Sequence, residues 1–130
     1  MTVVDASAIV ALLLSTRVAS SLSARLFVPG ETLHAPHLID IEVVQVLRRY
    51  AASGQISDRR GQVAIGDLTD LSLQRYPHAI LLPRVWDLRH NLSAYDATYV
   101  ALAEALGAPL VTMDGRIAGA PGHTAKVEVF

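Results

Sequence analysis

Acidic side chains stand near both ends of the stretch from Ser93 to Asp114, and carboxylates can bind metal ions or move protons. Ser93 is a good N-cap, and the residues after it predict a helix that ends at Gly107. Asp96 falls on the apolar face of this helix. Asp114 follows the apolar residues 110–113, which predict a buried strand. Since α/β folds bind ligands at the carboxyl edge of the sheet, Asp114 lies where a site is expected.

Acids from two further elements extend this pair. Asp5 follows the apolar residues 2–4, which predict a first buried strand. An amphipathic helix predicted over residues 36–53 carries Asp40 and Glu42 beside its apolar stripe, and the spacing does not decide which of them faces a site. A carboxylate cluster without histidine or cysteine suits Mg²⁺ or Mn²⁺ and supports phosphoryl transfer. Without a cation, the like charges would repel one another in a partly buried pocket.

Each of these acids also has a purely structural interpretation. Asp96 is three residues after Ser93 and can close a capping box, although Glu or Gln is the usual partner. Asp114 and Gly115 are a common turn dipeptide, and Asp40 suits the first turn of a helix through the helix dipole. For any one acid the structural interpretation is the stronger, so only their combination favours a site.

The composition predicts one compact domain over residues 1–130. Hydrophobic residues make up 52% of the chain and charged residues 18%, which favours a packed core over disorder. There is no cysteine, so disulfides and thiolate ligands are excluded. The apolar start carries Asp5 and no basic residue before Arg17, so we expect neither a signal peptide nor a membrane span, and a cytoplasmic protein. A net charge of −1 gives no basic field that indicates nucleic acid.

Strand and helix patterns alternate along the chain. Strands are predicted over residues 2–4, 32–35, 73–76, 110–113 and 126–129, and helices over 6–14, 18–27, 36–53, 57–71, 81–90 and 94–106. This alternation predicts an α/β fold with a mostly parallel sheet and helices on both faces. Between Asp114 and the last strand the chain is rich in Gly and Pro, and no element is predicted there.

Three segments resemble the PIN-domain ribonucleases of the VapC toxin type, from bacterial toxin–antitoxin pairs. They read VVDASAIVALLL, APHLIDIEVVQVLRR and LSAYDATYVALAEALGAPLVTMD, and the similarity covers essentially the whole chain. The third segment is the most specific, because both acids, both helix boundaries and the strand fall at the family's spacing. The resemblance implies a PIN-like three-layer α/β/α sandwich with a five-stranded, mostly parallel sheet.

Carried over residue by residue, the resemblance implies a catalytic pocket of four acids: Asp5, Glu42, Asp96 and Asp114. It thus selects Glu42 over Asp40. The Mg²⁺ or Mn²⁺ ligands that it implies are Asp5, Asp96 and Asp114, the last being the position that varies most and that can act through water. The resemblance also implies that small hydroxyl residues support the site, and Ser7 and Thr112 stand at these positions.

An acidic pocket needs cations beside it if it is to receive RNA, which is a polyanion. Arg116, two residues after Asp114, is the best-placed candidate, and Arg84 and Arg89 precede the Ser93 helix. For each of these arginines the alternative is an ordinary solvated side chain.

The resemblance implies a metal-dependent endoribonuclease toxin that cleaves tRNA or rRNA, arrests translation and is neutralised by a VapB-type antitoxin. It also implies a homodimer, and a heterotetramer or larger assembly with the antitoxin; we expect dimer contacts from residues 18–27 and 81–90. Two alternatives remain open. One is a PIN-fold module that binds RNA or protein without catalysis, which the intact acids argue against. The other is a different metal-dependent phosphohydrolase, although the haloacid-dehalogenase type needs an acid where Ser7 stands.

Overall fold

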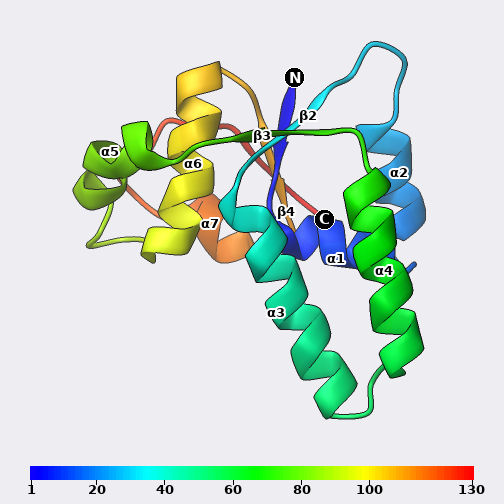
Figure 1. Ribbon diagram of the computed structural model, residues 1–130. Coiled ribbons are helices and arrows are strands. Elements are labelled where there is room, and N and C mark those ends of the chain that lie inside the picture. The colour runs from blue at the N-terminus through cyan, green and yellow to red at the C-terminus, as the bar shows by residue number, and fades with distance from the viewer.

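The computed structural model describes residues 1–130 and shows a sheet of five parallel strands (Figure 1). The strands are β1 (Thr2–Val4), β2 (Leu33–Pro36), β3 (Leu73–Tyr76), β4 (Leu110–Thr112) and β5 (Val127–Val129). Their order across the sheet is β3-β2-β1-β4-β5, so β1 is central. The predicted α/β class is confirmed, and the sheet is wholly parallel because every neighbouring pair of strands is parallel.

Seven α-helices and one 3₁₀ turn connect the strands. They are α1 (Ala6–Leu13), α2 (Ala19–Leu26), α3 (Leu38–Ala52), α4 (Asp58–Asp70), η1 (Ala79–Leu81), α5 (Leu82–Asp87), α6 (Ala94–Leu106) and α7 (Gly115–Gly119). In Figure 1, α5, α6 and α7 lie on one side of the sheet, and α1, α2 and α4 lie on the other. None of these helices is both long enough and apolar enough to cross a membrane.

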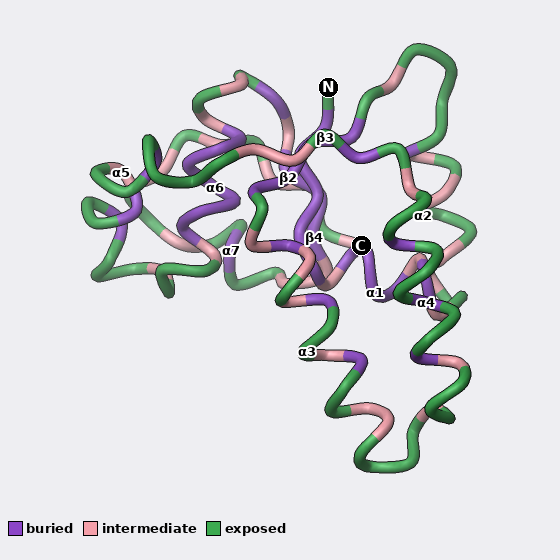
Figure 2. Tube along the Cα trace, viewed as in Figure 1, coloured by how far each residue is buried: buried purple, intermediate pink, exposed green.

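Helices cover both faces of the sheet, and this explains why its inner strands are so apolar. Every residue of β1, β2 and β4 is buried, whereas β3 and β5 at the edges are partly exposed (Figure 2). Helix α6 buries seven consecutive residues, from Ala97 to Ala103, and packs on β1 and β2. The elements β1, β4 and α6 therefore lie in the buried centre of the molecule, and they carry or precede three of the predicted acids.

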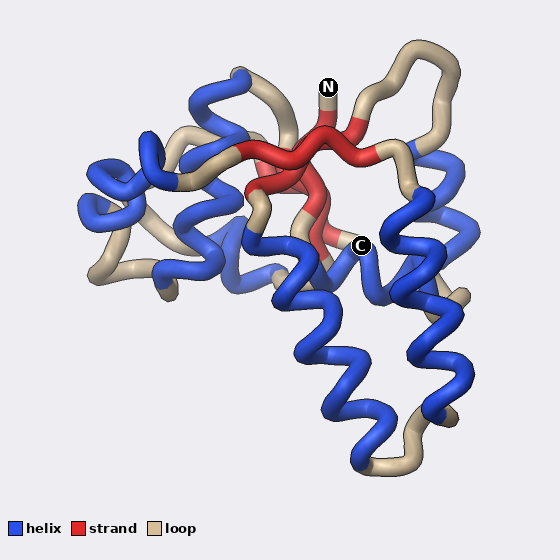
Figure 3. The backbone as a smooth tube through the Cα atoms, viewed as in Figure 1, coloured by secondary structure: helices blue, strands red, loops and turns tan.

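Helices α3 and α4 project beyond the sheet as a pair that is joined by a short loop over residues 53–57 (Figure 3). The first part of α3 remains close to the carboxyl end of β2, from which it follows directly. Further along, α3 packs against α1 and α4 and buries Val43 and Leu47.

The structure corrects two local expectations. Pro36 ends β2 and pairs in register with Tyr76, so α3 begins at Leu38 and not at the proline; the missing N–H of proline is tolerated at a strand end as well as in a first helical turn. The short helix α7 was not predicted. It begins because the side chain of Asp114 accepts a hydrogen bond from the backbone N–H of Arg116 at 2.9 Å.

Candidate active site

The four predicted acids reach one edge of the sheet from four different elements. Asp5 directly follows β1, and Asp114 lies just beyond β4, the parallel neighbour of β1. Glu42 comes from the second turn of α3, and Asp96 comes from the first turn of α6. Burial is the main cause that raises the pKa of both Glu42 and Asp96, and the negative charge of Asp5 adds to each rise, so the acids are close enough to influence one another.

Asp5 is the most enclosed of these acids, with 5% of its surface exposed. It is the N-cap of α1, and its Oδ1 accepts hydrogen bonds from the Ala8 N–H at 3.0 Å and the Ser7 hydroxyl at 2.6 Å. The Thr112 hydroxyl donates to Oδ2. Burial raises the pKa of the Asp5 carboxyl, and these donors partly oppose that rise. Both predicted support hydroxyls therefore contact Asp5 and fix its orientation.

The same two hydroxyls also hold the loop after β4. Ser7 Oγ accepts the backbone N–H of Met113, and Thr112 Oγ1 accepts the backbone N–H of Asp114, each at 2.9 Å. Each hydroxyl thus accepts from this loop while it donates to Asp5. The position of the Asp114 backbone is therefore coupled to Asp5 by a continuous set of hydrogen bonds.

Glu42 is held by a residue that the sequence did not single out for the site. The hydroxyl of Tyr99, a buried residue of α6, donates to Glu42 Oε1 at 2.6 Å. Burial raises the pKa of Glu42, the Tyr99 bond opposes this, and the charges of Asp96 and Asp5 add to it. The available signal was a phenol on the apolar stripe of the predicted helix, three residues after Asp96, since a buried Tyr hydroxyl needs a partner.

Asp40 faces elsewhere and forms an ion pair with Arg75 of β3, whose Nε lies 2.8 Å from Asp40 Oδ2. The two acids of α3 therefore have separate roles. Asp40 connects the helix to the edge strand, and Glu42 faces the other acids of the site.

Asp96 does not close the capping box that its spacing allowed. The Ser93 hydroxyl accepts the backbone N–H of Asp96 at 3.1 Å, which is an ordinary N-cap, but the carboxylate returns no hydrogen bond to the Ser93 N–H. Burial is the main cause that raises the pKa of Asp96; the Ser93 side chain opposes this rise, and the charges of Asp114 and Asp5 add to it. The backbone N–H of Asp96 thus takes part in the N-cap of α6, and its carboxylate faces the acidic site.

Asp114 differs from the other three acids because it forms an ion pair with an arginine. Arg116 donates from Nε to Oδ1 at 3.0 Å and from Nη2 to Oδ2 at 2.7 Å, and this contact lowers the pKa of Asp114. The Arg116 side chain is otherwise 91% exposed. Arg116 was proposed for RNA approach; the structure pairs it with Asp114, and its role in RNA approach stays a prediction.

The other two arginines proposed for RNA approach also have partners within the protein. Arg84 pairs with Glu104 through Nε at 2.8 Å and Nη2 at 3.0 Å. The guanidinium of Arg89 lies 4.4 Å from the centre of the Trp86 ring and donates to the Trp86 carbonyl. A role for these residues in RNA approach stays a prediction.

The donor set has the chemistry of a site for a hard divalent cation, since it offers carboxylate oxygens and no nitrogen or sulfur. Burial is the main cause of the raised pKa values of Asp5, Glu42 and Asp96, the neighbouring acids add to it, and a bound cation would stabilise the charged carboxylates. As the side chains are placed, however, no three acidic or histidine residues form a metal-binding group. The residues therefore fit Mg²⁺ or Mn²⁺ by their chemistry, and metal binding stays a prediction.

A model of the PIN-domain family matches residues 2–122. The chain belongs to the PIN-domain family. Within the family its relatives include three proteins of Mycobacterium tuberculosis. Ribonuclease VapC12 is 41% identical over 99% of this chain and 98% of its own length, and Ribonuclease VapC1 is 43% identical over 98% and 96%. Ribonuclease VapC9 is 46% identical over 90% of this chain and 88% of its own. These identities place this PIN domain with the VapC type.

Solved structures agree on the PIN fold. The chain is similar to the sarcin-ricin loop cleaving toxin VapC20 of Mycobacterium tuberculosis, with a TM-score of 0.70, 20% identity, and coverage of 95% of this chain and 97% of that one. It is also similar to VapBC2 of Rickettsia felis bound to a promoter DNA fragment, with a TM-score of 0.71, 14% identity, and coverage of 98% and 97%. At these identities the likeness shows the fold alone, and it confirms the PIN-like architecture.

Proposed function

We propose that this PIN domain is a Mg²⁺- or Mn²⁺-dependent endoribonuclease. The observation that carries the proposal is that Asp5, Glu42 and Asp96 come from three different elements to one edge of the sheet, where burial raises the pKa of each carboxyl. Perturbed carboxyls in one place favour a functional site over separate structural roles. Relatives that are 41–46% identical and bear the name ribonuclease support RNA as the substrate.

Asp5, Asp96 and Asp114 would hold the metal ion, which when bound activates a water molecule and offsets negative charge on the phosphate. The chain's own contribution is to orient the acids before substrate arrives. Ser7 and Thr112 fix the carboxylate of Asp5 through their hydroxyl groups. A site that is oriented in advance needs less rearrangement during the reaction.

Glu42 is the residue that we assign to proton transfer. Its Oε1 accepts from Tyr99, and Oε2 has no hydrogen-bond partner within the protein, so Oε2 is free to take a proton from the attacking water. Burial raises the pKa of Glu42, which makes its carboxylate a stronger base than an exposed one.

We further propose that the substrate is tRNA or rRNA, that its cleavage arrests translation, and that a VapB-type antitoxin neutralises the enzyme. The fold is shared with VapC20, described as a sarcin-ricin loop cleaving toxin, and with the toxin–antitoxin complex of Klebsiella pneumoniae. The VapC names of the more similar relatives support the same class of partner.

The proposal is tested by incubating the purified protein with total cellular RNA and mapping the new 5′ ends, with Mg²⁺, with Mn²⁺ and with a chelator. New ends are expected only with metal, and at few positions in tRNA or rRNA. RNA that is bound but stays intact with either metal would indicate instead a PIN module without catalysis.

A further inference from the structure

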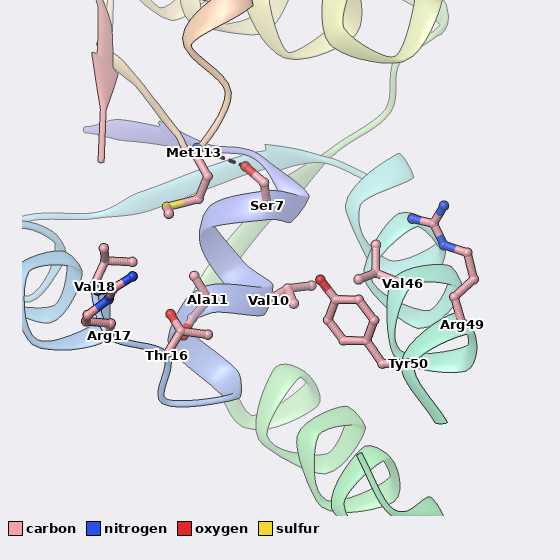
Figure 4. Close-up of a pocket in the computed structure, with 10 residues that line it drawn as sticks. All are labelled: Ser7, Val10, Ala11, Thr16, Arg17, Val18, Val46, Arg49, Tyr50 and Met113. Carbon is pink, nitrogen blue, oxygen red and sulfur yellow. Dashed lines mark hydrogen bonds between the residues drawn. The ribbon is translucent and has the colours of Figure 1, made fainter. Parts of the chain in front are cut away.

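A groove of about 440 Å³ lies beside the acidic site, between α1, the loop that follows it, and α3 (Figure 4). Ser7 and Met113 line the end of the groove next to Asp5, to which the Ser7 hydroxyl donates. Figure 4 shows the Tyr50 ring between Val10 and Val46 in the apolar part of the groove. Ser7 therefore connects the groove to the acidic site.

Two arginines border this groove on opposite sides (Figure 4). Arg17 lies beside Val18 after α1, and Arg49 lies beyond Val46 on α3. Both are exposed, and neither takes part in any ion pair of the protein. No carboxylate lines the groove. Its two cations thus have no anion of the protein to neutralise them.

A second groove, of about 430 Å³, adjoins the first on the other side of Arg49. It shares Val46 and Arg49 with the first groove, and it is lined by Glu42 of the acidic site and by Tyr95. Tyr95 is 60% exposed and directly precedes Asp96. Arg49 is seven residues after Glu42, or two helical turns and about 10 Å along α3. Arg49 therefore lines both grooves, one of which reaches Glu42 and the other Ser7, the hydrogen-bond partner of Asp5.

We propose that these two grooves hold the single-stranded RNA on either side of the bond that is cleaved. Arg17 and Arg49 bind backbone phosphates, and Tyr95 stacks on a base. The inference rests on the proposed function and adds positioning residues to it. Guanidinium groups bind phosphate oxygens through paired hydrogen bonds. A basic groove with aromatic side chains is a common way to bind single strands, whose unstacked bases also suit an apolar surface.

Charge favours RNA over a protein segment as the occupant. An amphipathic peptide also fits an apolar floor, but a peptide that reaches the acids has to be basic there. The unpaired cations Arg17 and Arg49 would repel such a peptide, and they attract a polyanion.

The test measures binding of a labelled single-stranded RNA to protein that carries Asp5→Asn, so that the RNA stays intact. Arg17→Gln and Arg49→Gln are each expected to weaken binding several-fold. Each should also reduce the slope of log affinity against log salt by about 0.7, the value for one phosphate contact on a single strand. Arg59→Gln is the matched control, because Arg59 is exposed on α4, forms no ion pair and lines neither groove.

Cleavage kinetics and NMR add readouts that a purely structural role would not change. In the active protein, the two arginine variants should raise KM with little change in kcat, since they bind the substrate away from the reacting atoms. Tyr95→Phe should keep RNA affinity, and Tyr95→Ala should lose it several-fold. Methyl signals of Val10, Val18 and Val46 should shift when RNA is added.

An equal loss of RNA affinity in Arg59→Gln, or wild-type affinity in the double variant Arg17→Gln/Arg49→Gln, would overturn the inference. Unshifted valine methyls at saturating RNA would also overturn it and leave a protein segment as the occupant of the groove. If the wild-type protein cleaves RNA and the groove variants behave like it, only this inference fails. If the wild-type protein cleaves no RNA, the proposed function itself fails.

Discussion

The hydroxyl of Tyr99 on α6 donates a hydrogen bond of 2.6 Å to Glu42 Oε1 on α3. Tyr99 is 1% exposed, so its ring is fixed by the packing of the core. Asp96 lies three residues before Tyr99, almost one turn away on the same helix. One buried side chain thus fixes the position of Glu42 relative to Asp96.

Tyr99→Phe removes this bond and leaves the ring in place. We expect a loss of about 1 kcal/mol in the free energy of unfolding. Because the Tyr99 bond lowers the pKa of Glu42, its loss should raise that pKa further. The acid limb of the pH profile of kcat/KM should then move to higher pH, since Glu42 acts when deprotonated. Tyr76→Phe is the control: its hydroxyl bonds to His34 in β2, away from the acids. An unchanged pH profile in Tyr99→Phe would remove Glu42 from the proton transfer.

Asp96→Asn should stabilise the protein when no metal is present. The folded-state pKa of Asp96 lies above its ordinary value of 3.8. Its charge therefore destabilises the fold; this penalty is absent below pH 3.8, grows as pH rises from 3.8 to the raised pKa, and is fully present above that pKa. At neutral pH with chelator, the melting temperature of Asp96→Asn should exceed that of the wild type by a few degrees. For a domain of this size, this corresponds to about 1 kcal/mol in the free energy of unfolding.

Below pH 3.8 the gain in melting temperature from Asp96→Asn should vanish, because the aspartic acid and the asparagine that replaces it are then both neutral. Asp40→Asn is the contrasting control, since Asp40 is paired with Arg75 and its loss should bring no gain. A lower melting temperature for Asp96→Asn at neutral pH would show that the carboxylate has a structural role.

Arg116→Ala should strengthen binding of Mn²⁺, measured by calorimetry. Arg116 holds both carboxylate oxygens of Asp114, so its removal frees them for a metal ion. If Mn²⁺ affinity is unchanged and RNA affinity falls, Arg116 instead has the role in RNA approach that the sequence suggested.

The segment from η1 to α5 is the best candidate for the homodimer contact that the resemblance implies. Ile80, Leu82 and Trp86 are 84%, 54% and 66% exposed, and such apolar side chains in one segment favour an interface. Sedimentation equilibrium should show a dimer at micromolar concentration, and Ile80→Asp should give a monomer. Val63→Asp on α4, which is 47% exposed, should remain dimeric. A monomeric wild-type protein would contradict this prediction.

The sequence predicts the elements well where a local pattern decides them. Ser93 caps α6 as expected, and Gly107 ends the helix with φ at 60°, in the left-handed region. Helix α7 could not be predicted, because it has five residues, two of them glycine, and too short a pattern to show periodicity. It depends on Asp114 as its cap and on burial of Ile117.

The site could be predicted in part. Asp5, Asp96 and Asp114 are visible from their places at strand ends and a helix start. Helical periodicity did not separate Glu42 from Asp40, because their partners are distant in the sequence. Tyr99 is 57 residues from Glu42, and Arg75 is 35 residues from Asp40. Only the fold brings these pairs together, so the resemblance to the family had to make the choice.

Asp5 and Asp96 are the residues that we propose to be essential for metal-dependent RNA cleavage. The most direct measurement is the cleavage rate of wild type, Asp5→Asn and Asp96→Asn at saturating Mg²⁺ or Mn²⁺, with circular dichroism to verify folding. We expect cleavage by the wild type that stops when metal is chelated, and a rate at least about a hundredfold lower in each variant, in line with the loss of one major electrostatic group. A folded variant of either kind that cleaves RNA at the wild-type rate would contradict the claim.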